Sequence, residues 1–196
     1  MLSFIEEYKN ALTSTECEKI IEYMNSTELS PGIVGGGINR EIKDSFDRTM
    51  WLDADDGYGA SEINKLIHTC LKKWSCVYTE KHHQLKNIHK WDLDIVYNLQ
   101  KYNPRQCYHK SHCENSGYPS TSNRMLAWMI YLNTVNDEGG TYFDNFEFKT
   151  KATQGSLLIW PAYWTHHHRG IPSPTETKYI ATGWCSYTDF VSDIVK

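Results

Sequence analysis

The chain has 196 residues, a formal net charge of −4 and 13% aromatic residues, with 7 Trp and 13 Tyr. This length suits one domain, residues 1–196, which would bury roughly 70% of the surface of its unfolded chain. No run of 18 apolar residues occurs and no signal peptide is recognisable, so we expect a cytoplasmic protein (in the host cell, if viral) without a membrane partner. The negative charge disfavours a nucleic-acid partner, which usually needs a basic surface.

Two amphipathic helices are predicted within residues 1–90. Thr13 and Glu16 have the spacing of a helix capping box, and apolar residues follow at helical intervals. A longer apolar stripe runs from about Ser61 to Thr79. Between the helices, residues 30–48 contain a glycine-rich segment without the Gly-Lys-Ser/Thr of a phosphate-binding loop. We expect a flexible surface loop there or, alternatively, a lid over an active site.

From about residue 91 the pattern changes to short strands separated by turns. The predicted strands are 94–102, 125–132, 140–143, 146–149, 155–160 and 178–187. Both faces of 125–132 are apolar, which is typical of a strand buried on both sides. Helices followed by many short strands predict a mainly β fold with N-terminal helices: a helical buttress over 1–90 and a β core over 91–190. Two-sheet jelly rolls belong to this class and hold ligands in their mouths.

The segment His112-Cys113-Glu114, with His168 further along, offers a set of metal ligands. Two imidazoles and one carboxylate make up the facial triad of non-haem iron oxygenases, which leaves coordination positions open. Side chains two residues apart share one face of a strand, so His112 and Glu114 could bind one metal. Catalytic zinc sites also use two His and one Glu. On a strand His166 would share a face with His168, so either could be the second imidazole.

Several motifs occur in the order seen in a known family. They are Tyr102 ten residues before His112, Arg124 with Tyr131-Leu132-Asn133, Gly139-Gly140-Thr141-Tyr142-Phe143, the strand from Gly155 to Pro161, and His168 followed by Pro172 and Lys178. They make residues 97–187 resemble the 2-oxoglutarate and Fe(II)-dependent oxygenases, specifically the prolyl 4-hydroxylase-like group. The resemblance implies a double-stranded β-helix, which is a cupin-like jelly roll. It also implies Fe(II), 2-oxoglutarate and O₂, and allows ascorbate as a reductant.

The resemblance further implies which residues hold these groups. His112, Glu114 and His168 would bind iron, and no other catalytic residue is expected. Lys178 would neutralise the distal carboxylate of 2-oxoglutarate, because an unpaired charge inside an apolar barrel is costly. Tyr131 would share that carboxylate.

Other residues are assigned to the cosubstrate pocket with less direct roles. Tyr102 would be a second pocket tyrosine. Thr182 and Trp184 lie on the face of Lys178 by strand alternation; Thr182 could donate a hydrogen bond and Trp184 could wall the site. The alternatives are a solvated surface lysine at position 178 and tyrosines that only fill the core.

The implied reaction is the hydroxylation of an unactivated C–H bond, on a prolyl residue of a peptide or protein. A free amino acid or another small molecule is an alternative substrate. A jelly-roll module that binds a metal without catalysis is an alternative from a different class. Glu114 departs from the family, which mostly has Asp here, and its extra methylene moves the carboxylate by about one carbon–carbon bond.

Overall fold

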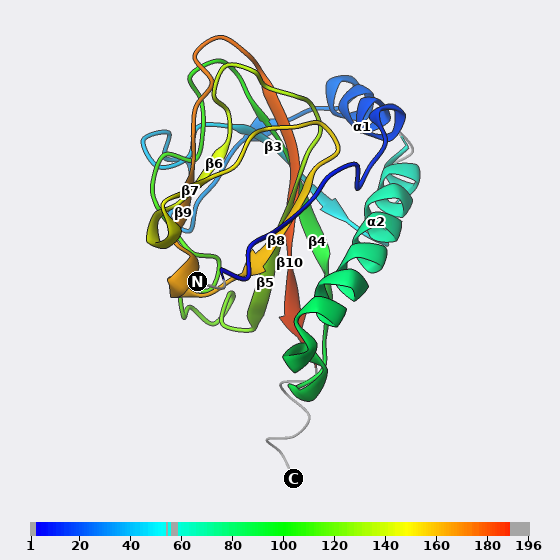
Figure 1. The fold of residues 1–196 in the computed structure, drawn as a ribbon. Helices are drawn as coiled ribbons and strands as arrows, with labels where there is room; N and C mark the ends of the chain where they lie inside the picture. The colour runs from blue at the N-terminus through cyan, green and yellow to red at the C-terminus, as the bar shows by residue number, and fades with distance from the viewer. Residues whose placement is uncertain (1–2, 54, 56–58, 189–196) are drawn as a thin grey trace.

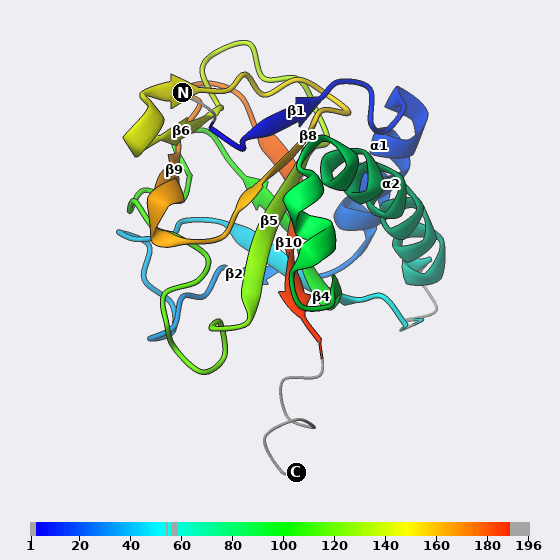
Figure 2. The same cartoon turned by 60° about the horizontal axis from the view of Figure 1, so that its bottom comes forward.

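Seven antiparallel strands form the larger of two sheets in the computed structural model, which describes residues 3–53, 55 and 59–188. In sheet order they are β1 (Glu6–Tyr8), β8 (Leu157–Pro161), β5 (Arg124–Tyr131), β10 (Lys178–Tyr187), β4 (Trp91–Tyr102), β3 (Phe46–Trp51) and β2 (Ser30–Pro31). The smaller sheet contains β7 (Phe148–Lys149), β6 (Thr141–Phe143) and β9 (His168–Gly170). Figure 1 shows the strands, and Figure 2 shows β5 and β10 side by side in the middle of the larger sheet.

Both predicted helices are confirmed. They are α1 (Ser14–Ser26) and α2 (Ala60–Lys81). Three short 3-10 helices follow later in the chain: η1 (His83–Asn87), η2 (Asp144–Phe146) and η3 (Trp164–His166). The predicted capping box starts α1: the Thr13 hydroxyl accepts from the Glu16 amide at 3.2 Å, and the Glu16 carboxylate accepts from the Thr13 amide at 2.8 Å. Within the described residues, no helix has the length and apolar character needed to cross a membrane.

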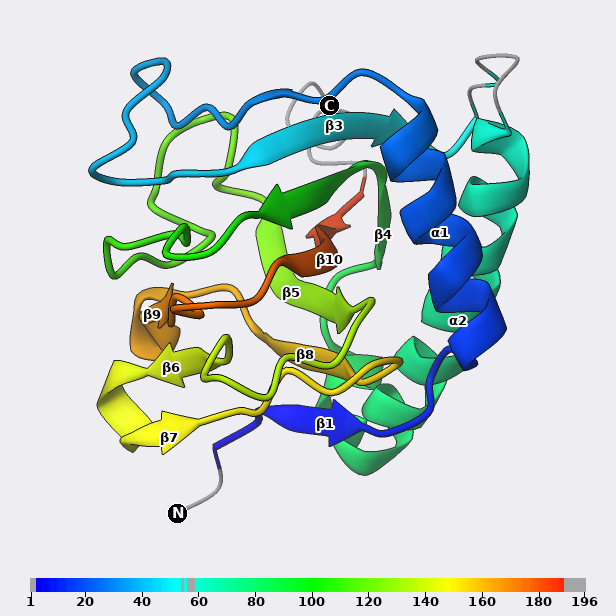
Figure 3. The ribbon, with the colours of Figure 1, turned by 90° about the horizontal axis from the view of Figure 1, so that it is seen from above.

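The two sides of the larger sheet have different coverings. The helices pack on one side and the smaller sheet lies on the other (Figure 3). Strand β5 contacts both layers: Leu126, Trp128 and Ile130 join the core under the helices, whereas Ala127 and Met129 join the core between the sheets. The prediction that both faces of this strand are buried is confirmed, and so is the mainly β fold with helices before its core.

The predicted helical buttress was incomplete, because residues 1–90 also supply three strands of the larger sheet, β1, β2 and β3. In strand β3 only Met50 is buried, and it packs in the core under the helices. The other residues of the strand are half-buried or exposed. Its central Asp47 and Arg48 weaken the alternating apolar pattern, so only pairing with β4 identifies it as a strand. The predicted end of the core at residue 190 lies outside the described residues.

The glycine-rich loop runs back toward the segment that precedes His112. Its tip is a tight turn in which Val34 and Gly37 exchange both main-chain hydrogen bonds. Further along, the Asp44 amide donates to the Cys107 carbonyl at 3.0 Å, and the His109 amide donates to the Ile42 carbonyl at 2.8 Å. The second half of the predicted loop therefore lies against residues 107–110.

Candidate metal centre

His112, Glu114 and His168 converge, with one possible ligand atom from each lying within 4.8 Å of the others. Glu114 Oε1 is 3.3 Å from Nε2 of His112 and 3.4 Å from Nε2 of His168. The side chains of His112 and Glu114 keep 21% and 16% of their exposure, while that of His168 keeps 7%. One carboxylate oxygen and two imidazole nitrogens thus face a common point, which is the donor set of a facial triad.

Main-chain hydrogen bonds fix the positions of the three residues. The His112 amide donates to the His168 carbonyl at 3.0 Å, and the His168 amide donates to the His112 carbonyl at 2.9 Å. The Glu114 amide donates to the carbonyl of Ala162, just past β8, at 3.0 Å. Residues 112–114 do not form a regular strand. Only His112 pairs with His168, as an isolated β-bridge, whereas the main chain of Glu114 bonds with Ala162 instead.

The outer nitrogens of the two imidazoles are bound to carbonyl groups. Nδ1 of His112 lies 3.0 Å from the Lys110 carbonyl oxygen, and Nδ1 of His168 lies 2.9 Å from the His166 carbonyl oxygen. A carbonyl can only accept, so each Nδ1 carries a proton and each Nε2 faces Glu114. Without a metal, a protonated Nε2 can donate to the carboxylate; a metal would take the place of that proton and bind the Nε2 lone pair. The ring of Tyr108 stacks on His112 at 3.8 Å between centroids and restricts its rotation.

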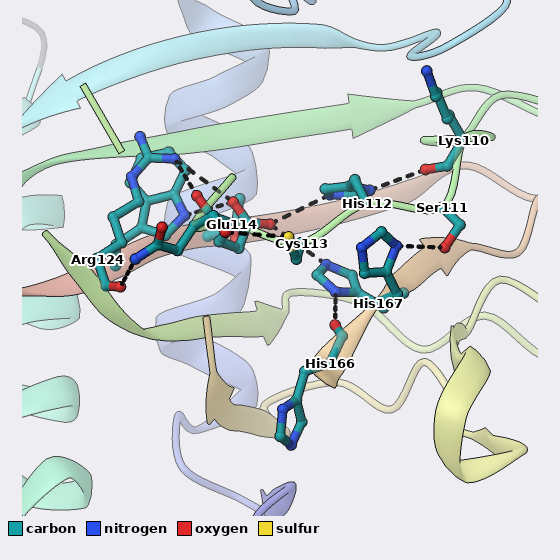
Figure 4. Close-up of polar contacts among 12 residues, drawn as sticks. Lys110, Ser111, His112, Cys113, Glu114, Arg124, His166 and His167 are labelled. Atoms are coloured by element: carbon teal, nitrogen blue, oxygen red, sulfur yellow. Dashed lines mark hydrogen bonds and ion pairs between the residues drawn. The ribbon is translucent and has the colours of Figure 1, made fainter. Parts of the chain in front are cut away.

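His166, the alternative to His168, lies outside the cluster. Its Nε2 is 2.8 Å from the Ser3 carbonyl oxygen, and Figure 4 shows its imidazole directed away from Glu114. Residues 164–166 form the 3-10 helix η3 rather than a strand, so His166 does not share the face of His168. The geometry therefore favours His168 as the second imidazole.

Glu114 is ionised in this setting. Burial alone would raise the pKa of its carboxyl, but hydrogen bonds and charge from His112 and His168 outweigh burial and hold the pKa well below its usual range. Trp184, expected to wall the site, donates its indole N–H to Glu114 Oε2 at 2.7 Å. Arg124, for which the sequence predicted no role, places a guanidinium nitrogen 3.8 Å from the same oxygen (Figure 4).

Lys178 is a buried cation, with only 5% of the residue exposed. Its ammonium donates to the Gly139 carbonyl at 2.8 Å and lies 5.0 Å from the centroid of the Tyr102 ring. Within the described part of the chain, no carboxylate pairs with it. Burial lowers the pKa of Lys178 to about 8. The alternative of a solvated surface lysine is therefore wrong.

The remaining predicted pocket residues form hydrogen bonds within the protein. The Tyr131 hydroxyl bonds with the hydroxyls of Thr141 at 2.9 Å and Thr150 at 2.8 Å, and the Tyr102 hydroxyl donates to Gln100 at 2.7 Å. Tyr131 bonds with Thr141, and Lys178 bonds with Gly139, two residues earlier in the chain. The two side chains therefore contact the same short segment. The sequence offered one signal for Thr141, its place in the Gly-Gly-Thr-Tyr-Phe motif, and none for Thr150.

The hydroxyl of Thr182 donates a hydrogen bond to the neighbouring strand of the larger sheet. The hydroxyl donates to the Trp128 carbonyl on β5 at 2.9 Å. Its oxygen can still accept a hydrogen bond, but the donor role expected from the sequence is taken by the main chain.

The residues present fit the implied metal and cosubstrate. Two neutral imidazoles and a carboxylate suit Fe(II), and three protein ligands leave positions for other ligands. The unpaired ammonium of Lys178 fits one carboxylate of a dicarboxylic acid, since a buried charge requires an opposite charge or hydrogen bonds. The same layer between the sheets contains apolar side chains, including Met129, Phe143 and Trp160, which would exclude water.

Comparison with known proteins supports the resemblance drawn from the sequence. Residues 97–186 match the model of the 2OG-Fe(II) oxygenase superfamily. A protein of Acanthamoeba polyphaga mimivirus named "Putative prolyl 4-hydroxylase" is 24% identical over 191 residues, which cover 89% of this chain and 71% of that protein. The sequence-based resemblance to this superfamily is therefore confirmed.

Solved structures of prolyl hydroxylases share the fold. The viral collagen prolyl hydroxylase of Paramecium Bursaria Chlorella virus-1, solved as a 2OG complex, superposes with a TM-score of 0.70 at 18% identity, over 94% of this chain and 97% of that one. A Trichoplax adhaerens prolyl hydroxylase, solved with a hypoxia inducible factor peptide fragment, has a TM-score of 0.74 at 18% identity, over 94% and 84%. The predicted cupin-like jelly roll is confirmed.

Proposed function

We propose, from the match of residues 97–186 to the model of the 2OG-Fe(II) oxygenase superfamily, that this protein is a dioxygenase that hydroxylates a prolyl residue of a peptide or protein. The observation that carries the proposal is the convergence of His112, Glu114 and His168 on one point. The mimivirus relative and the two structures named above are prolyl hydroxylases by name, and this supports a prolyl substrate.

The three ligands would hold Fe(II) through His112 Nε2, His168 Nε2 and Glu114 Oε1. Bound Fe(II) supplies the redox chemistry by which one oxygen atom of O₂ enters the substrate C–H bond while the other converts 2-oxoglutarate to succinate and CO₂. The carbonyls of Lys110 and His166 orient the imidazoles, so that both metal-binding nitrogens face the carboxylate.

Lys178 would bind the distal carboxylate of 2-oxoglutarate. A buried ammonium without a carboxylate partner gains a strong charge-assisted hydrogen bond when an anion arrives. The hydroxyl groups of Tyr131 and Thr141 bond with each other two residues beyond Gly139 and could bond with that anion. Phe143 and Trp160 pack against His168, with ring centroids 5.5 and 5.1 Å away, and would keep water from this side of the site.

An anaerobic titration with Fe(II) and 2-oxoglutarate tests the metal site. Wild-type protein should develop the visible charge-transfer band of chelated 2-oxoglutarate. His112→Ala and His168→Ala should lose the band, whereas the matched control His166→Ala should keep it. Well-folded wild-type protein without a band would refute the oxygenase proposal and leave a metal-binding jelly roll as the better account.

Product analysis tests the substrate. Proline-containing peptides should give hydroxyproline with stoichiometric succinate, and free proline should give neither. Turnover of free proline, with no reaction on peptides, would replace the peptide substrate by a small molecule.

A further inference from the structure

The two carboxylate oxygens of Glu114 have different partners. Oε1 faces the two histidines at 3.3 and 3.4 Å. Oε2 accepts the indole N–H of Trp184 at 2.7 Å and lies 3.8 Å from the Arg124 guanidinium. The side chain therefore presents one oxygen to the metal position and has the other bound by the protein.

A glutamate needs such a restraint more than an aspartate does. Its extra methylene adds one rotatable bond, so its carboxylate can turn and offer a metal either oxygen or both. A hydrogen bond to Oε2 removes that freedom, because rotation of the carboxylate would break a charge-assisted contact. With Oε2 held by Trp184, Glu114 would bind a metal through Oε1 alone.

Arg124 in turn restrains Trp184 and Glu114. Its guanidinium carbon lies 3.5 Å from the centroid of the Trp184 ring, which is a close cation–π stack. One of its nitrogens also donates to the main-chain carbonyl of Glu114 at 3.3 Å. A planar guanidinium can stack and donate at once, which the ammonium of a lysine cannot reproduce. Arg124 therefore ties the indole plane to the backbone of the metal ligand.

Trp184 lies at an irregularity in the pairing of β10 with β4. The register of β10 against β4 shifts between Gly183 and Cys185, while Trp184 stays paired with Ala127 on β5. Such irregularities re-aim side chains next to functional sites. Gly183 is required beside it, because a Cβ there would lie 2.6 Å from the ring of Trp128.

We propose that Trp184 and Arg124 are positioning residues that hold Glu114 in one-oxygen metal binding and thereby allow a glutamate to serve where the family mostly has aspartate. The inference rests on the proposed function for the identity of the metal site. It assigns to Trp184 a role at the metal ligand rather than at the cosubstrate.

Metal affinity in a double-mutant cycle tests the proposal. Trp184→Phe removes the indole N–H and keeps an aromatic ring under Arg124. It should weaken Co(II) binding, measured by calorimetry on the apoprotein, by roughly 10- to 100-fold, as loss of a ligand-orienting hydrogen bond does. The Co(II) visible spectrum should also change, because its d–d bands depend on coordination number. Trp164→Phe is the matched control, since Trp164 is 72% exposed.

The same substitution is then made in the Glu114→Asp background. The shorter carboxylate cannot reach both the metal position and the indole, so Trp184→Phe should change Co(II) affinity there by less than about two-fold. Equal losses in both backgrounds would assign Trp184 a packing role and overturn the proposal, as would wild-type affinity and spectrum in the single variant. Arg124→Lys should lose affinity in the same direction as Trp184→Phe.

The outcomes separate this inference from the proposed function. Wild-type protein that binds Co(II) but shows no 2-oxoglutarate band would refute the function while the cycle still decides the roles of Trp184 and Arg124. A normal band together with an unaffected Trp184→Phe variant would refute the inference alone. Wild-type protein that binds no divalent metal would refute both.

Discussion

Replacing Lys178 by methionine should have opposite effects on folding and on ligand binding. Methionine matches the length of the apolar stem of the lysine and lacks its ammonium. In the free protein this ammonium is buried, and its only hydrogen-bond partner among the described residues is the Gly139 carbonyl. The bound state would instead pair it with a carboxylate. The variant should therefore be more stable than wild type without 2-oxoglutarate and should bind 2-oxoglutarate more weakly.

The size of both effects follows from the environment of Lys178. A fall in its pKa from 10.5 to about 8 corresponds to about 3 kcal/mol of unfavourable free energy for the charged form. Removing the ammonium should stabilise the folded protein by that amount. The Gly139 carbonyl then loses its hydrogen-bond donor, which should cost roughly 1 kcal/mol. The apoprotein should thus gain about 2 kcal/mol at pH 7. Loss of one partner of a buried charge pair should weaken 2-oxoglutarate binding by about 2 kcal/mol or more, roughly 30-fold.

The gain in stability should depend on pH in a defined direction. The folded protein releases the Lys178 proton near pH 8, whereas the unfolded chain keeps it until about pH 10.5. Wild-type stability should therefore rise between these pH values relative to the methionine variant, because the unfolded chain binds more protons there. Below pH 8 the full difference between the two proteins should be present.

Urea unfolding of the apoproteins from pH 7 to 10, together with calorimetric titration of 2-oxoglutarate into the metal-loaded proteins, measures both effects. Lys151→Met is the matched control, because Lys151 is exposed and should show neither effect. An apoprotein that loses several kcal/mol in Lys178→Met, with an unchanged affinity for 2-oxoglutarate, would refute the assignment. Lys178 would then be a structural lysine that stabilises the Gly139 turn.

Three further predictions concern the fold and the metal. Thr13→Ala removes the capping box of α1 and should cost about 1 kcal/mol in urea unfolding, whereas the control Thr153→Ala lies outside that helix and should not affect it. Phe143→Ala should cost about 3–5 kcal/mol, because this side chain is fully buried between the sheets; a loss below 1 kcal/mol would show that the site collapses around the cavity. Saturating Fe(II) under anaerobic conditions at about 100 times its dissociation constant should stabilise the protein by about 2.7 kcal/mol, reversibly with chelator, and Glu114→Ala should not respond.

Local and periodic signals identified most of the secondary structure. The capping box and apolar stripe of α1 depend on residues within two turns, and β10 was predicted with the bounds observed, Lys178–Tyr187. Strands β1 and β3 were missed because a strand of three residues, or one with charged residues in its middle, is recognisable only through its partners. The strand predicted at 146–149 is shorter, because η2 includes Phe146.

The sequence by itself determined the chemistry of the site, since its residue types and their order predict two imidazoles, a carboxylate and a distant lysine. Tertiary structure decided which atoms meet. It separated His168 from His166, because the chain turns through η3 before β9 begins. It also brought Trp184 and Arg124 to Glu114, across 70 and 10 residues of sequence. Contacts of this kind depend on how strands from distant segments pair and pack, and no local pattern records that pairing.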